Sequence, residues 1–416
     1  MVLEFGYGNG FQSVDIPEKN LQAVLVSNQM QHERRGREAV EYALKHPIVS
    51  EPLHRIAKPG QKAVIVTSDI SRPMPSSDVL PSVLGELNAA GIPDSDITVV
   101  FGLGSHRNHT EEEKKKLAGE EAYSRVRCMD STPDDCVSFG TTSRGTPVDI
   151  SRVVAEADLR ICLGNVEFHY FAGYSGGYKA IMPGVSTPAA IQANHRMIMD
   201  ERAHAGKLTG NPLREDIEEA GAMVGVDFIV NVVLDEHRHI VYAAAGDVVK
   251  AHRDACEYLN KMYLKPIDSL ADIVIVSQGG APKDANLYQV QKALDNAKHA
   301  VKQGGTIILV GACPEGLGNK VFSEWMTSAE KPQDLIDRIH RQFVLGGHKA
   351  AAIAQTELKA HIDLISEMDD DLVRRLFMTP RKNLQEAFDA AIKKHGEAAS
   401  VIAMPFGGAT LPVLKA

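Results

Sequence analysis

The sequence is poor in cysteine. Its five cysteines are scattered along 416 residues and show no C-x-x-C spacing, which excludes a zinc ribbon and argues against a disulfide framework. We therefore expect reduced thiols and a cytoplasmic protein. The cysteines are Cys128, Cys136, Cys162, Cys256 and Cys313.

Basic residues are in the minority. The chain has 45 lysines and arginines against 54 aspartates and glutamates, for a formal net charge of −9. That balance does not suit nucleic acid or an anionic membrane. No stretch approaches the ~20 apolar residues of a membrane-spanning helix, and the N-terminus lacks a basic region followed by an apolar run, so no secretory signal is expected. We expect neither nucleic acid nor a membrane as a partner.

The remaining composition is that of a globular protein, with 44% hydrophobic and 24% charged residues. Short β-branched runs alternate with helical patterns. Residues 62–67 and 97–104 predict two strands that flank a helix over 76–91, and such a unit predicts a parallel sheet. Residues 228–235 and 239–247 predict a hairpin. The other expected elements are strands at 157–165, 271–280, 306–312 and 399–408 and a helix over 286–305.

These elements predict the class of fold and its division. We expect an α/β protein of two domains with largely parallel sheets. A proline-containing connector lies near residues 262–270. We therefore place an N-terminal domain at residues 1–265 and a C-terminal α/β domain at residues 266–416.

Four polar loops, rich in glycine or proline, each follow a predicted strand. Ligands of open α/β sheets bind beyond the carboxyl ends of the strands, so four such loops indicate a site. Three belong to the first domain and one to the second, which predicts an active site in the interdomain cleft. The loops cover residues 68–75, 104–113, 164–184 and 277–289.

The first two loops hold side chains suited to carboxylate binding and to proton transfer. Arg72 carries a planar fork that binds both oxygens of a carboxylate, although Asp69 and Arg72 can instead pair with each other across the turn. His106 and His109 have a metal-like H-x-x-H spacing without an obvious third ligand. His106 is the better candidate, because His109 directly precedes a helix that begins with a capping box at Thr110.

The third loop, HYFAGYSGGYKAIMPG, runs from His169 to Gly184 and presents Lys179 among glycines. It matches neither the G-x-x-x-x-G-K-[ST] phosphate loop nor the G-x-G-x-x-G dinucleotide fingerprint. Glycines allow positive φ and let a ligand approach the backbone. A lysine in such surroundings loses solvation, which lowers its pKa and makes it a nucleophile or an attachment point. An exposed lysine on a rigid crossover loop is the alternative.

The fourth loop leads into a helix that begins with Tyr288, Gln289 and Lys292. Residues four apart share a helical face, so Tyr288 and Lys292 point the same way. A helix N-terminus also favours anions. These side chains are therefore either ligand-binding groups or an ordinary polar helix face.

In this order, the motifs resemble those of the nickel-dependent lactate racemase family. The similarity runs from about residue 60 to residue 300 and returns at the C-terminal end. The segments that carry it are SDISRPMP, GSHR, GNVEFHYFAGYSGGYKAIMPG, NHRMI, GGAPKDANLYQVQKAL and VIAMPFGGATLPV.

The resemblance implies a cofactor, the nickel pincer nucleotide (pyridinium-3,5-bisthiocarboxylic acid mononucleotide nickel), which other enzymes have to synthesise. It implies that Lys179 forms a thioamide link to this group and that His195 completes the nickel coordination. Tyr288, Gln289 and Lys292 match cofactor-binding residues of the second domain. The N-terminal domain would then tether the cofactor, and the C-terminal domain would close the site.

The resemblance also implies the catalytic residues. His106 and His169 match two acid–base histidines, while Asp69 and Arg72 match an active-site pair in which the arginine lies near the substrate carboxylate. This sequence departs from the family pattern in two places. Ser71 stands where we expect threonine, and His109 has no counterpart in the family pattern that we can assign.

The implied reaction is racemisation or epimerisation of a small 2-hydroxy acid such as lactate. Removing the Cα proton is hard because of the neighbouring carboxylate. Removing hydride while a base takes the hydroxyl proton gives a 2-keto acid, and hydride return to the other face inverts the centre. A tethered hydride acceptor suits that route, as do two histidines that exchange protons near neutral pH.

Three alternatives remain at this stage. A dehydrogenase using free NAD would carry a glycine-rich fingerprint followed about 20 residues later by an acidic residue, and we find none. A non-catalytic hydroxy acid binding protein would use Arg72 only as a clamp. Within the family, malate, an aromatic hydroxy acid or an aldonate would suit the same reacting centre as lactate.

Overall fold

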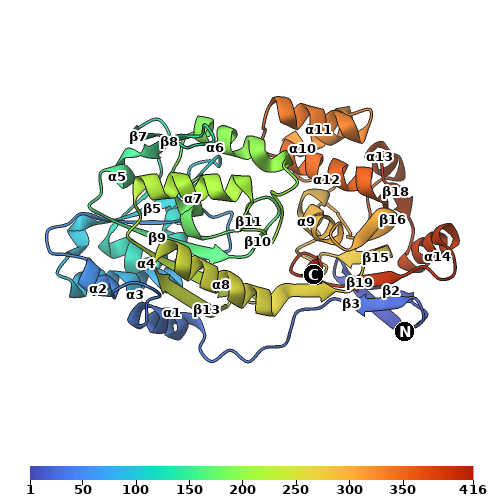
Figure 1. Ribbon diagram of the computed structural model, residues 1–416, viewed down its shortest axis with the longest axis horizontal. Coiled ribbons are helices and arrows are strands. Elements are labelled where there is room, and N and C mark those ends of the chain that lie inside the picture. The colour runs from blue at the N-terminus through green and yellow to red at the C-terminus, as the bar shows by residue number, and fades with distance from the viewer. Residues whose placement is uncertain (416) are drawn as a thin grey trace. The chain divides into compact units, whose positions relative to one another are not determined.

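The computed structural model describes residues 1–415. The chain divides into two compact units, whose course Figure 1 shows. Unit 2 is a continuous segment, Met30–Lys261, and unit 1 combines Met1–Gln29 with the chain from Met262 onward.

Unit 2 is built on a six-stranded sheet with the order β13-β12-β9-β4-β5-β6. Its neighbours are parallel except for β12 and β13, which form the predicted antiparallel hairpin. Strands buried on both faces are nearly continuous apolar runs, and β4 is such a strand. The strands are β4 (Ala63–Ser68), β5 (Ile97–Gly102), β6 (Arg127–Asp130), β9 (Leu159–Val166), β12 (Phe228–Leu234) and β13 (Ile240–Gly246).

The helices of unit 2 bury apolar faces against this sheet. In α3 the buried residues Val79, Leu80, Val83, Leu84 and Leu87 recur at helical spacing and join the core of the sheet. The helices are α1 (Gly36–Lys45), α2 (Leu53–Ile56), α3 (Ser76–Ala89), α4 (Glu111–Arg125), α5 (Arg152–Ala155), α6 (Pro188–His195), α7 (Pro212–Val224) and α8 (Val248–Tyr263). The short elements are β7 (Cys136–Thr141), β8 (Pro147–Ser151), β10 (Phe168–His169), β11 (Gly173–Tyr174) and the 3-10 turns η1 (Asp94–Asp96), η2 (Gly177–Ala180) and η3 (Arg196–Met199).

Unit 1 has its own six-stranded sheet, β18-β17-β16-β15-β19-β3, in which all neighbours are parallel. The strands of unit 1, which include the two separate pairs β1-β2 and β14-β20, are β1 (Val2–Tyr7), β2 (Gly10–Asp15), β3 (Leu21–Val24), β14 (Leu264–Ile267), β15 (Ala271–Ser277), β16 (Val301–Val310), β17 (His361–Ile365), β18 (Thr379–Arg381), β19 (Val401–Met404) and β20 (Leu411–Leu414). Its helices are α9 (Leu287–Ala297), α10 (Lys320–Ser328), α11 (Pro332–Arg341), α12 (Gly347–Lys359), α13 (Asp370–Arg375) and α14 (Leu384–His395). The α/β class, the two units and the largely parallel sheets confirm the predicted fold.

The first 29 residues correct the predicted domain limits of 1–265 and 266–416. The boundary near residue 262 agrees with the connector, but Met1–Gln29 belongs to the unit that contains the C-terminal sequence. The physical reason is strand pairing: β3 is the edge strand beside β19. Phe5 and Val14 of the β1–β2 hairpin also share a hydrophobic core with Ile273.

The helix predicted over 286–305 is shorter in the structure. It ends at Ala297, and β16 already begins at Val301, which pairs with Ala271 of β15. The two glycines that suggested a helix end lie inside β16 instead. Gly304 has φ +77° next to an irregularity in the ladder between β15 and β16, and glycines in a strand commonly mark such a bulge.

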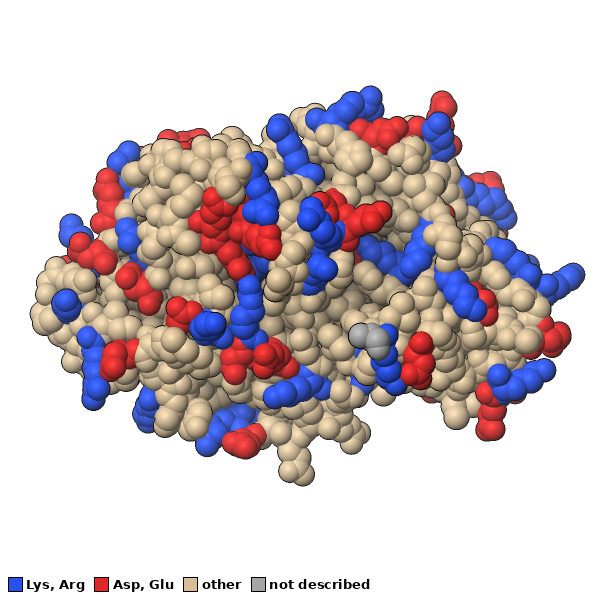
Figure 2. All heavy atoms as spheres, in the orientation of Figure 1, with Lys and Arg blue, Asp and Glu red and all other residues tan. Residues whose placement is uncertain are grey.

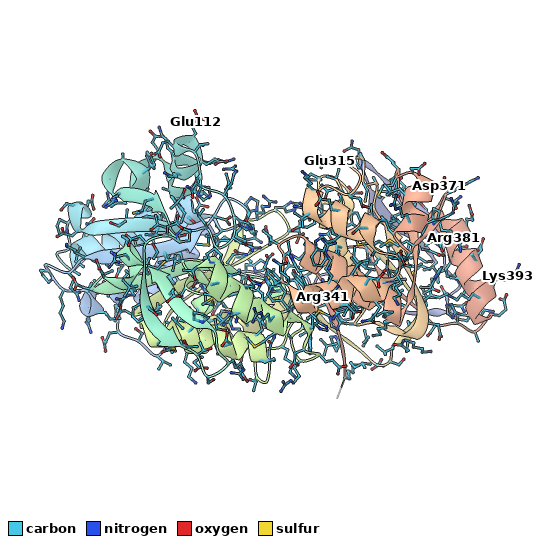
Figure 3. All side chains as sticks on the ribbon, turned by 90° about the horizontal axis from the view of Figure 1, so that it is seen from above. Glu112, Glu315, Arg341, Asp371, Arg381 and Lys393 are labelled. Atoms are coloured by element: carbon cyan, nitrogen blue, oxygen red, sulfur yellow. The ribbon has the colours of Figure 1, made fainter. Side chains whose placement is uncertain are left out.

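Most charged residues in the described part of the chain are partly or fully exposed. Figure 2 shows basic and acidic side chains interspersed over the visible face, and Figure 3 shows Glu112 of α4 and Lys393 of α14 pointing away from their helices. Within residues 1–415, every helix is too short or too polar to cross a bilayer.

Candidate active site

Three of the four predicted loops lie at one edge of the unit 2 sheet. They follow β9, β4 and β5, which are consecutive in the sheet, so the carboxyl ends of these parallel strands point to the same edge. Two of the loops are joined directly, because the Gly104 N–H donates to the Gly184 carbonyl at 2.8 Å. The fourth loop follows β15 in unit 1 and is described separately below.

Asp69 and His106, from two neighbouring loops, form a hydrogen-bonded pair. The Asp69 carboxylate is buried and accepts from Nδ1 of His106 and, at 2.8 Å, from the hydroxyl of Ser71. Burial raises the pKa of Asp69, but the hydrogen bond and charge of His106, with Ser71 and Arg72, outweigh it, so the pKa lies below its ordinary value. The carboxylate is therefore ionised and holds the imidazole with Nε2 left for proton exchange. Ser71 keeps the hydroxyl that this arrangement uses.

Among the described ion pairs, the Asp69 carboxylate pairs with His106 and not with Arg72. The Arg72 backbone N–H closes the turn on the Asp69 carbonyl at 3.1 Å, and the arginine is exposed. Its positive charge acts on Lys179 in the third loop. The guanidinium can therefore take a carboxylate in its fork.

Phe171 brings the remaining predicted residues of unit 2 together, although the sequence analysis did not single it out. Its buried ring meets His169 edge-to-face at a centroid distance of 4.4 Å and His195 at 5.0 Å. The Lys179 Nζ lies 5.6 Å from the same ring centroid. A run of four consecutive ring side chains, Phe168 to Phe171, was the available signal. The ring of Phe171 thus lies next to both histidines and the lysine.

Lys179 has the environment that the glycine-rich loop predicts for it. Burial is the main cause that lowers its pKa well below the ordinary value, and the charges of Arg72 and Arg214 add to it against the opposing effect of Glu167. An unprotonated amine is a nucleophile. Burial therefore favours the neutral form of this amine.

The glycines of this loop also allow close packing within the protein. Gly176 has φ +76°, and a Cβ there would lie 2.7 Å from Oδ1 of Asn231. Gly177 has φ +60°, and a Cβ there would lie 2.8 Å from Nη2 of Arg214. The Gly177 N–H also donates to the Asn231 Oδ1 at 2.9 Å. Any larger residue would push the loop off the side chains beneath it.

Arg214 and His252 form this buried support under the loop. Arg214 donates to the carbonyls of Tyr174 and Gly176 at 3.3 and 3.4 Å and to Nδ1 of His252 at 3.0 Å. The Nε2 of His252 donates to the Ser175 carbonyl at 2.8 Å. Burial, and then the charge of Arg214, hold the pKa of His252 well below its ordinary value, so the ring is neutral.

The sequence alone does not single out Arg214, because it is one of several charged residues in a polar helix. It lies at the third position of α7, after Pro212, with its side chain only 1% exposed. A cation in the first turn opposes the helix dipole. That unfavourable position was a signal that the arginine is needed elsewhere, and Glu218 compensates it with an ion pair at 2.7 Å.

The H-x-x-H pair does not act as a unit. His109 is buried and its Nδ1 lies 2.6 Å from Asp130, whereas His106 pairs with Asp69. Within residues 1–415, no group of three or more His, Cys, Asp or Glu side chains is arranged to hold a metal ion by itself.

The candidate residues of unit 1 lie at the start of α9. Asn286 caps this helix by accepting the Gln289 N–H at 3.1 Å. The ring of Tyr288 meets Phe322 edge-to-face at 5.5 Å, and the Lys349 Nζ lies 4.0 Å from its centroid. Tyr288 and Lys292 are both partly exposed, as expected for residues that share one helix face.

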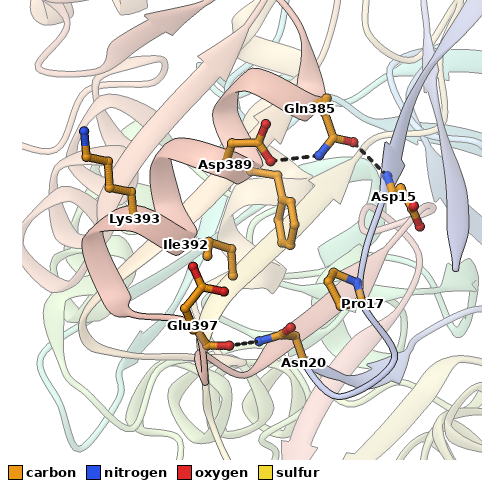
Figure 4. Close-up of a pocket in the computed structure, with 9 residues that line it drawn as sticks. Asp15, Pro17, Asn20, Gln385, Asp389, Ile392, Lys393 and Glu397 are labelled. Carbon is orange, nitrogen blue, oxygen red and sulfur yellow. Dashed lines mark hydrogen bonds between the residues drawn. The ribbon is translucent and has the colours of Figure 1, made fainter.

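A pocket elsewhere in unit 1 contains none of the predicted residues. Figure 4 shows it between the β2 segment and α14, where Gln385 bridges Asp389 and the Asp15 N–H, and Asn20 donates to the Glu397 carbonyl. These polar groups satisfy one another within the protein. The pocket is lined by Asp15, Pro17, Asn20, Gln385, Phe388, Asp389, Ile392, Lys393 and Glu397.

Comparison with known proteins shows similarity along almost the whole chain. Residues 7–206 match the lactate racemase N-terminal domain, and residues 267–411 match the lactate racemase C-terminal domain. The lactate racemase of Lactiplantibacillus plantarum is 32% identical over 98% of both chains, and that of Thermoanaerobacterium thermosaccharolyticum is 32% identical over 94% of both. The lactate racemase apoprotein structure from the latter organism superposes with a TM-score of 0.89 at 30% identity, covering 100% of both chains.

With the two α/β units and the histidine-bearing loops, these relatives define the chain as an enzyme of the isomerase class, a racemase. A Thermotoga maritima structure at 19% identity, with a TM-score of 0.62, supports the fold alone. The chain belongs to the lactate racemase family.

Proposed function

We propose that the chain racemises or epimerises a small 2-hydroxy acid, with lactate as the first substrate to test. Two relatives at 32% identity are lactate racemases. The single observation that carries the proposal is the hydrogen-bonded pair of Asp69 and His106, which lies in the same unit as Lys179, whose pKa burial lowers well below the ordinary value. Acid–base chemistry and covalent attachment are thus both available on one sheet edge.

The substrate-handling residues follow from the chemistry of a 2-hydroxy acid. Arg72 binds the carboxylate through its fork and fixes the position of Cα. His106 takes the hydroxyl proton at Nε2, and Asp69 stabilises the imidazolium that results. The substrate then passes through its 2-keto acid. His169 serves the other enantiomer in the same way, so each histidine is base in one direction and acid in the other.

The proposed cofactor is the nickel pincer nucleotide, linked to Lys179 and bound through its nickel by His195. When bound, it supplies an acceptor that takes the Cα hydrogen as hydride and returns it. The residues fit this group. A thioamide link needs an unprotonated amine, and the environment of Lys179 favours that form. The described residues offer no complete metal site of their own, so the proposal requires the nucleotide to provide the other nickel ligands.

Residues of unit 1 complete the proposal. We assign Tyr288, Gln289 and Lys292 to cofactor binding. Support comes from the match of residues 267–411 to the C-terminal family domain. The partners required are the enzymes that synthesise the cofactor, and the expected location is the cytoplasm, where all five cysteines would stay the free thiols they are here.

The test is a racemisation assay on protein produced together with the cofactor-making enzymes. Single enantiomers of lactate, malate, an aromatic hydroxy acid and an aldonate are incubated without added nicotinamide cofactor and analysed by chiral chromatography. Loss of optical purity with one of them is the expected result and identifies the substrate. Activity only after NAD is added would favour a dehydrogenase. Binding without any change in configuration would favour a hydroxy acid binding protein.

A further inference from the structure

His109 is the second histidine of the loop at residues 104–113, and the proposed reaction gives it no role. Its side chain is only 1% exposed. Asp130, the last residue of β6, holds it from two sides: one carboxylate oxygen accepts the His109 backbone N–H at 2.8 Å, and the other lies 2.6 Å from Nδ1. The ring also rests against Phe101 of the sheet core, with centroids 5.6 Å apart. His109 is thus fixed in position and orientation.

The second ring nitrogen of His109 is committed as well. Nε2 lies 3.0 Å from the backbone N–H of Ile70. A backbone N–H can only donate, so Nε2 has to offer its lone pair, and a carboxylate can only accept, so Nδ1 carries the proton. This geometry selects one neutral tautomer. Neither nitrogen remains for a metal ion or for a substrate proton.

The residue that His109 holds is the centre of the catalytic turn. Ile70 stands between Asp69, which orients His106, and the Ser71–Arg72 pair. Ile70 is 38% exposed, so core packing does not secure this part of the turn. Its backbone is tied instead through His109 to Asp130. The loop after β4, the loop after β5 and the last residue of β6 each contribute one member to that connection.

We propose that His109, oriented by Asp130, is a positioning residue that sets the Asp69–Arg72 turn by accepting the Ile70 N–H. The proposal that this turn is catalytic rests on the proposed function, whereas the hydrogen bond itself does not. The two can therefore be tested separately, one on the apoprotein and the other on the loaded enzyme.

The apoprotein test measures the hydrogen bond. We expect the ¹⁵N shifts of His109 to show a protonated Nδ1 and an unprotonated Nε2. Exchange of the Ile70 amide hydrogen should be about fivefold faster or more in His109→Leu, which is the size expected for one hydrogen bond. It should stay near the wild-type rate in His109→Gln, whose side-chain oxygen can accept. A protonated Nε2, or equal exchange in wild type and both variants, would overturn the assignment.

The enzyme test measures the consequence for the reaction. With the substrate that the racemisation assay identifies, kcat/KM should fall about tenfold or more in His109→Leu and by less than about threefold in His109→Gln. Thr110→Ala is the control, because it removes the neighbouring capping box and leaves Ile70 and Asp130 in place. A loss in His109→Leu no larger than in Thr110→Ala would contradict the positioning role. If the leucine variant does not fold, the wild-type ¹⁵N shifts and the glutamine variant decide the question.

Discussion

Nδ1 of His106 donates a hydrogen bond to Oδ2 of Asp69, whose side chain is only 4% exposed. The two residues come from loops that follow adjacent strands, β4 and β5. The buried anion fixes the tautomer of the imidazole and favours its protonated form when it takes a proton. The hydrogen bond to Asp69 thus orients His106 so that it can act as a base.

Asp69→Asn should remove the charge while keeping the shape. The neutral amide cannot stabilise an imidazolium, so we expect kcat to fall by about 10²–10⁴ while KM changes much less. Steady-state kinetics on the loaded enzyme measures both. Asp134→Asn, at an exposed aspartate of the same unit, is the matched control. An unchanged kcat in Asp69→Asn would remove the pair from the reaction.

Lys179 should react as a neutral amine at a lower pH than an ordinary lysine. Its pKa is lowered by burial and then by Arg72 and Arg214, so the pH midpoint for amine labelling of the apoprotein should fall below that of exposed Lys250. Arg72→Gln removes one positive charge and should move the Lys179 midpoint upward. Peptide mass spectrometry over a pH series gives all three midpoints, and coincident values for Lys179 and Lys250 would contradict the prediction.

Gly176→Ala should destabilise the protein through both strain and collision. Gly176 has φ +76° and a Cβ would meet Asn231 at 2.7 Å, whereas Gly225 has φ +77° with open space around it. We expect Gly225→Ala to cost about 1 kcal/mol and Gly176→Ala about 2–4 kcal/mol of unfolding free energy. Urea unfolding of both variants checks the difference. Equal losses of unfolding free energy would contradict the prediction, because they would mean that Asn231 moves aside and relieves the collision.

His252 should make the stability of the protein fall in mild acid. Its pKa in the folded protein lies well below the ordinary 6.5, so below that pH the unfolded chain binds a proton that the folded chain does not. The contribution of the neutral His252 ring to the unfolding free energy is fully present above about pH 6.5. It is lost at up to ~1.4 kcal/mol per pH unit as the pH falls below that value. His252→Gln has no such proton, so its unfolding free energy should depend less on pH between 7.5 and 5. Parallel pH dependences would contradict the prediction.

Local patterns predicted much of the fold correctly, and the ends of the predicted strands indicated a candidate site. The apolar run of β4, the hairpin of β12 and β13 and the capping box at Thr110 each depend on neighbouring residues, and all appear as predicted. Asp69 and His106 were found because each follows such a strand. Strand ends therefore locate a site even without knowledge of the partners within it.

Local patterns could not predict the contacts between residues that lie far apart in the sequence. Arg214 and His252 come from α7 and α8, and only the folded chain brings them under Gly177. The pairing of β3 with β19 spans almost the entire sequence. The bulge in β16 reads as a helix end, because glycine marks both features.

The measurement that tests the proposed function most directly is the intact mass of the protein produced together with the cofactor-making enzymes, with nickel analysis of the same sample. We predict a nucleotide-sized adduct on the Lys179 peptide with near-stoichiometric nickel, and neither in Lys179→Ala, while Lys250→Ala behaves as wild type. Stable retention of the nucleotide by Lys179→Ala would show that the lysine is not the attachment point. No adduct and no nickel in the wild-type chain, beside a related racemase loaded in the same cells, would contradict the proposed cofactor and favour a hydroxy acid binding protein.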